Sequence, residues 1–195
     1  MRLLLIRHAK PKPIVPGEGA DPNLSYDGNE QTRRLPDTLS KFTLARVVSS
    51  PQRCAKQTAA PVADQLGMTV EVDDRLAEFD YGLERNLPAA DAPTGDLPQE
   101  VDAEAFMARV KAAIDDVVQS GEASDTVAII THRGVISALL HSVMKTEQFF
   151  SVELDYAGIT RLETSANGKL TVASVNGTDH VWDILYRTQW WSEEH

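Results

Sequence analysis

The chain has 195 residues, of which 42% are hydrophobic and 25% charged, a balance that is usual for a globular domain and excludes collagen-like and low-complexity classes. The formal net charge of −10 argues against binding to nucleic acid or to an acidic membrane surface, because both need a basic face. A single cysteine cannot form an internal disulfide, and no apolar run is long enough to cross a bilayer. We therefore expect a cytoplasmic protein with one domain over residues 1–195.

Strands and helices are expected to alternate through the first half of the chain. Apolar runs that are typical of buried parallel strands are separated by stretches with helix start and stop signals. In chain order we expect a strand at 3–6, a helix at 25–42, a strand at 44–49, a helix at 51–66 and a strand at 69–72. Pro36 is expected to break or kink the first helix, because an internal proline removes a backbone donor.

The second half begins with an irregular stretch, residues 79–100, which we expect to be an insertion or lid. The alternation then resumes, and Asn167-Gly168 is a strong signal for a tight hairpin turn. In chain order we expect a helix at 103–119, a strand at 126–131, a helix at 133–144 and hairpin strands at 156–163 and 169–175. This order predicts an α/β fold, namely a three-layer α/β/α sandwich with a mostly parallel sheet, helices on both faces and an antiparallel edge hairpin.

Histidine and arginine side chains follow the ends of the predicted strands. His8 comes directly after the first strand and His132 directly after the strand at 126–131. In open α/β sheets the ligand crevice lies outside the carboxyl ends of the strands, so both imidazoles are expected at one crevice. Arg7 precedes His8, and Arg53 opens the helix after another strand. Together with helix N-termini, these side chains predict a site for an anion.

Several segments, taken in order, carry recognisable motifs. They are Leu4-Leu5-Ile6-Arg7-His8, the stretch from Asp21 to Gly28 with Gln31, Ser49 to Ala59, Leu76 to Glu84, and Thr131 to Ile136. These motifs resemble the histidine phosphatase superfamily, also called phosphoglycerate-mutase-like, over residues 3–140. The sequence departs from the family pattern at Ala9 and Arg133, where glycine is usual, and at Arg85. It also has no asparagine over 11–16, near the position of a common phosphate-binding residue of the family.

The resemblance implies a metal-independent phosphomonoesterase that acts through a phosphohistidine intermediate on a small phosphorylated metabolite, without a cofactor. It implies that His8 is the nucleophile and that Glu78 is the general acid, and afterwards the base for the hydrolytic water. Arg7, Arg53 and His132 would hold the phosphoryl oxygens and stabilise the charge that develops on them. A backbone carbonyl that accepts the other ring N–H of His8 would fix its tautomer.

Other polar residues carry weaker expectations. Arg133 and Lys10 would add contacts to the substrate. For Arg133 the alternative is a contact through its backbone N–H rather than its side chain, and for Lys10 the alternative is a solvated surface charge. Cys54 is expected to be buried as a small apolar side chain, and His141 to lie outside the pocket. The histidines are scattered and show no metal-ligand spacing, so no metal is expected.

Two other functions stay open at this stage. One is a cofactor-dependent phosphoglycerate mutase, although such mutases are typically longer than this chain. The other is a weakly catalytic protein that binds a phosphorylated ligand, which the missing asparagine and Arg133 motivate.

Overall fold

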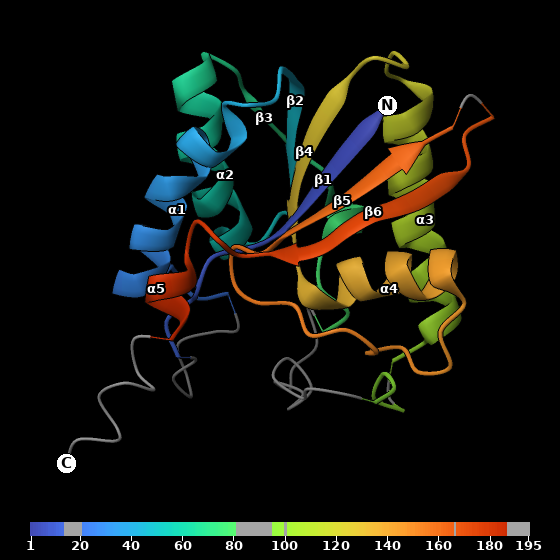
Figure 1. Cartoon of the computed structure of the whole chain (residues 1–195). Helices are drawn as coiled ribbons and strands as arrows, with labels where there is room; N and C mark the ends of the chain where they lie inside the picture. Colours follow the sequence, from blue (N-terminus) through green and yellow to red (C-terminus); the bar gives the residue numbers. More distant parts are fainter. Residues whose placement is uncertain (14–20, 81–94, 100, 166, 187–195) are drawn as a thin grey trace.

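The strands form one mixed sheet (Figure 1). The computed structural model describes residues 1–13, 21–80, 95–99, 101–165 and 167–186. The strands are β1 (Arg2–Arg7), β2 (Leu44–Ser49), β3 (Val70–Val72), β4 (Thr126–Thr131), β5 (Ile159–Thr164) and β6 (Leu170–Gly177). Within the described residues the strand order is β3-β2-β4-β1-β5-β6. The first four of these pair in parallel, whereas β5 runs antiparallel to β1 and to β6. The predicted mostly parallel sheet with an antiparallel edge hairpin is therefore confirmed.

Helices cover both faces of the sheet, as predicted (Figure 1). They are α1 (Tyr26–Leu39), α2 (Arg53–Leu66), the 3-10 turn η1 (Asp74–Leu76), α3 (Ala103–Gln119), α4 (Arg133–Met144) and α5 (Trp182–Leu185). The helices α1 and α2 pack on one face, and α3 and α4 pack on the other. None of these helices combines the length and the apolar character that a membrane span requires.

The apolar run of β1 explains how one strand serves two cores. Leu3 and Leu5 belong to the core that faces α3 and α4, whereas Leu4 and Ile6 belong to the core that faces α1 and α2. All four side chains are fully buried. Because successive side chains point to opposite faces of a sheet, a central strand covered on both sides must be apolar throughout. The apolar part of β1 therefore ends at Arg7 and His8, where the chain passes beyond the two cores.

The break that was one of the two effects expected of Pro36 is not found. The helix α1 is not broken there but continues to Leu39, and the carbonyl of Pro36 accepts the backbone N–H of Ser40 at 2.9 Å. Leu35 and Leu39 are both buried in the core, and their packing offsets the single backbone hydrogen bond that the proline removes. The start of α2 also differs, because this helix begins at 53 rather than 51.

The expected lid over 79–100 falls mostly outside the described residues. Its beginning, Phe79 and Asp80, lies beside the carboxyl ends of the central strands β1 and β4. Its later part includes Gly95, whose backbone forms an isolated bridge with Phe150. The structure therefore fixes the two sides of this stretch, and the lid itself stays a prediction.

Candidate active site

Two histidines from distant parts of the chain meet where β1 and β4 end. His8 follows β1 directly, and His132 is the N-cap residue of α4 directly after β4. These strands are parallel neighbours in which Arg7 lies opposite Thr131, so the residues that follow them are also adjacent. The ring centroids of His8 and His132 are 5.0 Å apart, and both side chains are buried. The sheet topology thus brings the two imidazoles to one point.

A small cavity of about 100 Å³ opens beside the two imidazoles. Its walls come from the ends of β1 and β4, from the start of α2 and from the segments that carry Glu78 and Tyr156. The lining residues are Arg7, His8, Pro11, Pro22, Gln52, Cys54, Glu78, Asp80, His132, Arg133 and Tyr156.

The hydrogen bond of His8 defines its tautomer. Its Nδ1 lies 2.9 Å from the carbonyl oxygen of Ala9, and this oxygen can only accept, so Nδ1 carries the ring proton and donates it. The Nε2 atom is left with a lone pair. Burial, together with the positive charge of Arg7, lowers the pKa of His8 to about 3. The imidazole is therefore neutral at physiological pH and can act as a nucleophile.

Arg7 is a buried cation that neighbouring backbone holds in place. Its Nη1 donates to the carbonyl of Leu154 at 2.5 Å, and its guanidinium carbon lies 3.9 Å from the centroid of the Tyr156 ring. The backbone N–H of Ala157 donates to the Arg7 carbonyl at 3.0 Å. Among the described residues the buried Nε of Arg7 has no hydrogen-bond partner. A buried donor on a cation beside a cavity is suited to an anionic ligand.

The Glu78 carboxyl group lies at the N-terminus of α4. Its Oε1 accepts the backbone N–H of Phe79 at 3.0 Å, and its Oε2 accepts that of Gly134 at 2.9 Å. Gly134 leaves room for this approach, because a Cβ at that position would lie 2.2 Å from Oε1. Burial raises the pKa of Glu78 to about 7, and this effect outweighs the two hydrogen bonds, which favour the ionised form. The carboxyl group can therefore give and take a proton near neutral pH.

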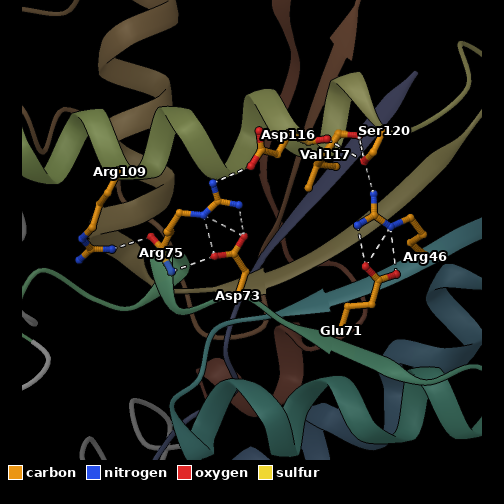
Figure 2. A network of polar contacts seen from close by, with 8 residues as sticks. All are labelled: Arg46, Glu71, Asp73, Arg75, Arg109, Asp116, Val117 and Ser120. Atoms are coloured by element: carbon orange, nitrogen blue, oxygen red, sulfur yellow. Dashed lines mark hydrogen bonds and ion pairs between the residues drawn. The ribbon is translucent and has the colours of Figure 1, made fainter.

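An arginine on α3 fixes the backbone that carries Glu78. Arg109 donates through Nη1 to the carbonyls of Arg75 and Ala77, at 2.6 and 2.8 Å, and through Nη2 to the carbonyl of Glu78 at 3.0 Å. Figure 2 shows Arg109 beside Arg75, whose own guanidinium bridges Asp73 and an acidic residue of α3. These bonds tie the segment after β3 to α3 and set the position of the carboxyl group.

Ser50 holds the second histidine. Its Oγ lies 2.7 Å from Nε2 of His132, and both side chains are buried. Burial lowers the pKa of His132 well below its ordinary value, and the neighbouring His8 ring and the positive charge of Arg7 act in the same direction. The other ring nitrogen, Nδ1, is not engaged by this serine.

Arg53 and Lys10 do not line the cavity. The Arg53 side chain is 60% exposed, and its Nε lies 3.7 Å from Oδ2 of Asp21. Lys10 is partly exposed and pairs through Nζ with Asp27 at 2.9 Å. Arg133 does line the cavity and is buried, with its guanidinium carbon 4.4 Å from the centroid of the Phe150 ring. The structure thus brings the side chain of Arg133 to the cavity, but not those of Arg53 and Lys10.

Several residues of the site carried no expectation from the sequence. Ser50 and Gln52 lie inside a recognised motif, and their positions directly after β2 were a usable signal. Asp80 also lies inside a recognised motif, close to Glu78 in the chain. Tyr156 and Arg109 had no comparable signal, since they reach the site through contacts between distant segments. His141 lies outside the cavity, as expected, and its Nδ1 is 2.9 Å from Oγ1 of Thr146. Cys54 is buried, also as expected.

The family of the chain follows from comparison with known proteins. Residues 3–177 match the model of the histidine phosphatase superfamily (branch 1). The chain therefore belongs to this superfamily, and the resemblance read from its motifs is confirmed.

Individual relatives share the length and the fold of this chain. The putative phosphoserine phosphatase 2 of Hydrogenobacter thermophilus is 30% identical over 200 residues, covering 92% of this chain and 97% of that protein. A mycobacterial glucosyl-3-phosphoglycerate phosphatase superposes with a TM-score of 0.75 at 24% identity, covering 90% of this chain and 98% of its own. A variant of the phosphoserine phosphatase of Entamoeba histolytica, solved with phosphoserine, superposes with a TM-score of 0.72 at 19% identity. This match covers 92% of this chain and 98% of that chain. The two solved structures show a shared fold.

Proposed function

We propose that the chain is a metal-independent phosphomonoesterase that acts through a phosphohistidine at His8 on a small phosphorylated metabolite. The observation that carries the proposal is the state of His8, a buried neutral imidazole whose Nε2 lone pair is free for attack. His132 and Arg7 adjoin it as hydrogen-bond donors, and Glu78 adds a carboxyl group with a pKa of about 7. Nucleophile, anion site and acid are thus supplied by one cavity.

In the first step, Nε2 of His8 forms a bond to phosphorus while the bond from phosphorus to the ester oxygen breaks. Protonated Glu78 gives its proton to the leaving oxygen, so the product is a neutral alcohol. In the second step a water oxygen attacks the phosphohistidine, and the Glu78 carboxylate takes a proton from this water. The bond between nitrogen and phosphorus breaks, inorganic phosphate leaves, and both residues return to their starting states.

Donors around the cavity stabilise the transferred phosphoryl group. Arg7 is oriented before any ligand binds, so its charge needs little rearrangement during the reaction. A bound phosphate dianion would raise the pKa of His132 and allow the imidazolium to donate to the same oxygens. Arg53 would join them only by turning away from Asp21, and Lys10 only by leaving Asp27. We therefore assign Arg7 and His132 the main part of phosphate binding.

The cavity and the relatives support one class of substrate. A volume of about 100 Å³ suits a phosphoryl group with a small attached moiety. Arg133 lines the same cavity and can bind a carboxylate of the substrate. Relatives are named phosphoserine phosphatase and glucosyl-3-phosphoglycerate phosphatase, and one was solved with 3-phosphoglyceric acid. Phosphate esters of small carboxylic acids are therefore the first compounds to test.

Hydrolysis of an aryl phosphate in the presence of a metal chelator tests the proposal. Wild-type protein should release phosphate, and an alkaline quench should trap phosphoryl groups on His8. The variant His8→Ala should lose both signals, whereas His141→Ala, which removes a histidine outside the cavity, should keep them. Full activity of His8→Ala, or strict dependence on a divalent metal, would contradict the mechanism. Interconversion of the two phosphoglycerates would instead identify a mutase.

A further inference from the structure

Cys54 lies beside the two histidines, and the proposed phosphoryl transfer does not use its thiol. One ring nitrogen of His8, one of His132 and the Sγ of Cys54 all lie within 4.8 Å of one another. The three side chains are buried and come from the end of β1, the first turn of α2 and the N-cap of α4. Cys54 also belongs to a small buried cluster with Ala9 and Leu24. The cluster is therefore a compact set of one sulfur and two nitrogen atoms.

These donors match the ligands of a tetrahedral zinc ion. Zinc binds imidazole nitrogen at about 2.0–2.1 Å and thiolate sulfur at about 2.3 Å, which places ligand atoms of one ion roughly 3.3–3.7 Å apart. The present separations, all within 4.8 Å, require at most small movements of the side chains. The tautomer of His8 leaves Nε2 free to coordinate. Three protein ligands would leave a fourth position for water.

Nearby charges act in both directions on a bound cation. The guanidinium of Arg7 adjoins His8 and opposes binding. The carboxylates of Asp21 and Glu78 act on Cys54, where burial first and these two negative charges after it raise the pKa of the thiol to about 12. Coordination replaces the thiol proton, which goes to solvent, by a bond from sulfur to the metal. The metal thus neutralises the thiolate that burial disfavours.

We propose that His8, Cys54 and His132 form an inhibitory site for a thiophilic divalent cation such as Zn²⁺. The bound cation takes the lone pair of His8 that the proposed reaction needs, and it occupies the space beside His132. Zinc and the phosphoryl group therefore exclude each other. The existence of the metal site is independent of the proposed function, whereas the inhibition rests on it.

Cobalt titration tests the site without any measurement of activity. Co²⁺ bound to a thiolate absorbs in the near ultraviolet, and Cys54 is the only cysteine of the chain, so this band can report only on that residue. We expect one equivalent of Co²⁺ to produce the band and Zn²⁺ to remove it. The variants Cys54→Ser and His132→Ala should lose the band or weaken cobalt binding at least about tenfold. His141→Ala should leave it unchanged, and circular dichroism should show that every variant is folded.

The absence of a thiolate band in the folded wild-type protein would overturn the proposal, as would a band that His132→Ala leaves unchanged. A second experiment measures inhibition, with each variant compared with its own rate in a chelator. Zn²⁺ should inhibit the wild type, a chelator should restore the rate, and Cys54→Ser should raise the half-inhibitory concentration at least about tenfold. Equal inhibition of Cys54→Ser would place the inhibitory ion elsewhere. Normal hydrolysis without a cobalt band refutes only the metal site, whereas a band without hydrolysis refutes only the phosphatase.

Discussion

The substitution Glu78→Gln separates proton donation from the other roles of this side chain. Glutamine has nearly the same size, and its amide oxygen can still accept one of the two backbone N–H groups that Glu78 binds. It cannot give a proton to a leaving oxygen. The variant should therefore keep phosphate binding and the phosphorylation of His8 by esters whose leaving group needs no proton.

The size of the effect follows from the pKa of Glu78. A carboxyl group with a pKa of 4.5 would be protonated in roughly one molecule in 300 at pH 7, whereas a pKa of about 7 keeps roughly half of the molecules protonated. The difference corresponds to about 3 kcal/mol in the availability of the acid. General acid catalysis by a positioned side chain contributes about 10²- to 10⁴-fold to a rate. Glu78→Gln should therefore lower the kcat for an alkyl phosphate by at least about 100-fold.

The assay compares two leaving groups in the same variant. The serine released from phosphoserine leaves as an alkoxide unless its oxygen is protonated. The p-nitrophenol released from p-nitrophenyl phosphate leaves as a stable phenolate. The loss of kcat/KM should be much larger for phosphoserine than for the aryl ester, because kcat/KM reports the phosphorylation of His8 and not the later hydrolysis in which Glu78 acts as base. Glu122→Gln, at an exposed site away from the cavity, should change neither rate. Equal losses for both esters, or no loss for either, would refute the assignment of Glu78 as the acid.

Further predictions concern pH, packing and the second histidine. The pKa of Glu78 is raised, so the acid is protonated below about pH 7, and kcat for phosphoserine should fall above this pH with a limb that Glu78→Gln lacks. Gly134→Ala places a Cβ against the carboxyl group and should lower the free energy of unfolding by about 1–3 kcal/mol in urea titrations. Gly177→Ala, whose Cβ would meet nothing closer than 3.5 Å, should leave the free energy of unfolding free of this steric loss. Ser50→Ala removes the 2.7 Å hydrogen bond to the second histidine and should lower kcat about 5- to 100-fold in steady-state assays. Ser137→Ala, which removes a buried hydroxyl without a partner among the described residues, should leave kcat unchanged.

The part of the site that lies on the ends of strands could be predicted from the sequence. A buried central strand must be apolar throughout, so its end is visible as the change from Ile6 to Arg7 and His8. The same change marks Thr131 and His132. Parallel strands end at one edge of a sheet, and this rule alone brings the two imidazoles together.

The directions of long side chains could not be predicted in the same way. Arg53 occupies the expected place at the start of α2, yet its guanidinium turns to Asp21, because an ion pair at the surface competes with the cavity. Tyr156 and Arg109 reach the site through contacts between segments that are distant in sequence. Hydrophobic periodicity carries no information about such contacts. The sequence therefore predicts which backbone positions meet, and the side-chain partners depend on the folded structure.

One physical cause sets the protonation states of both reacting groups. Burial disfavours charge, so it lowers the pKa of His8 to about 3 and raises that of Glu78 to about 7. Between these values the nucleophile is neutral and the acid is protonated, as the proposed reaction requires. With ordinary values of 6.5 and 4.5, histidine would be neutral only above the pH at which the carboxyl group has lost its proton. A substitution that admits water to the cavity should therefore remove the pH range in which both groups are reactive, even if every catalytic side chain is retained.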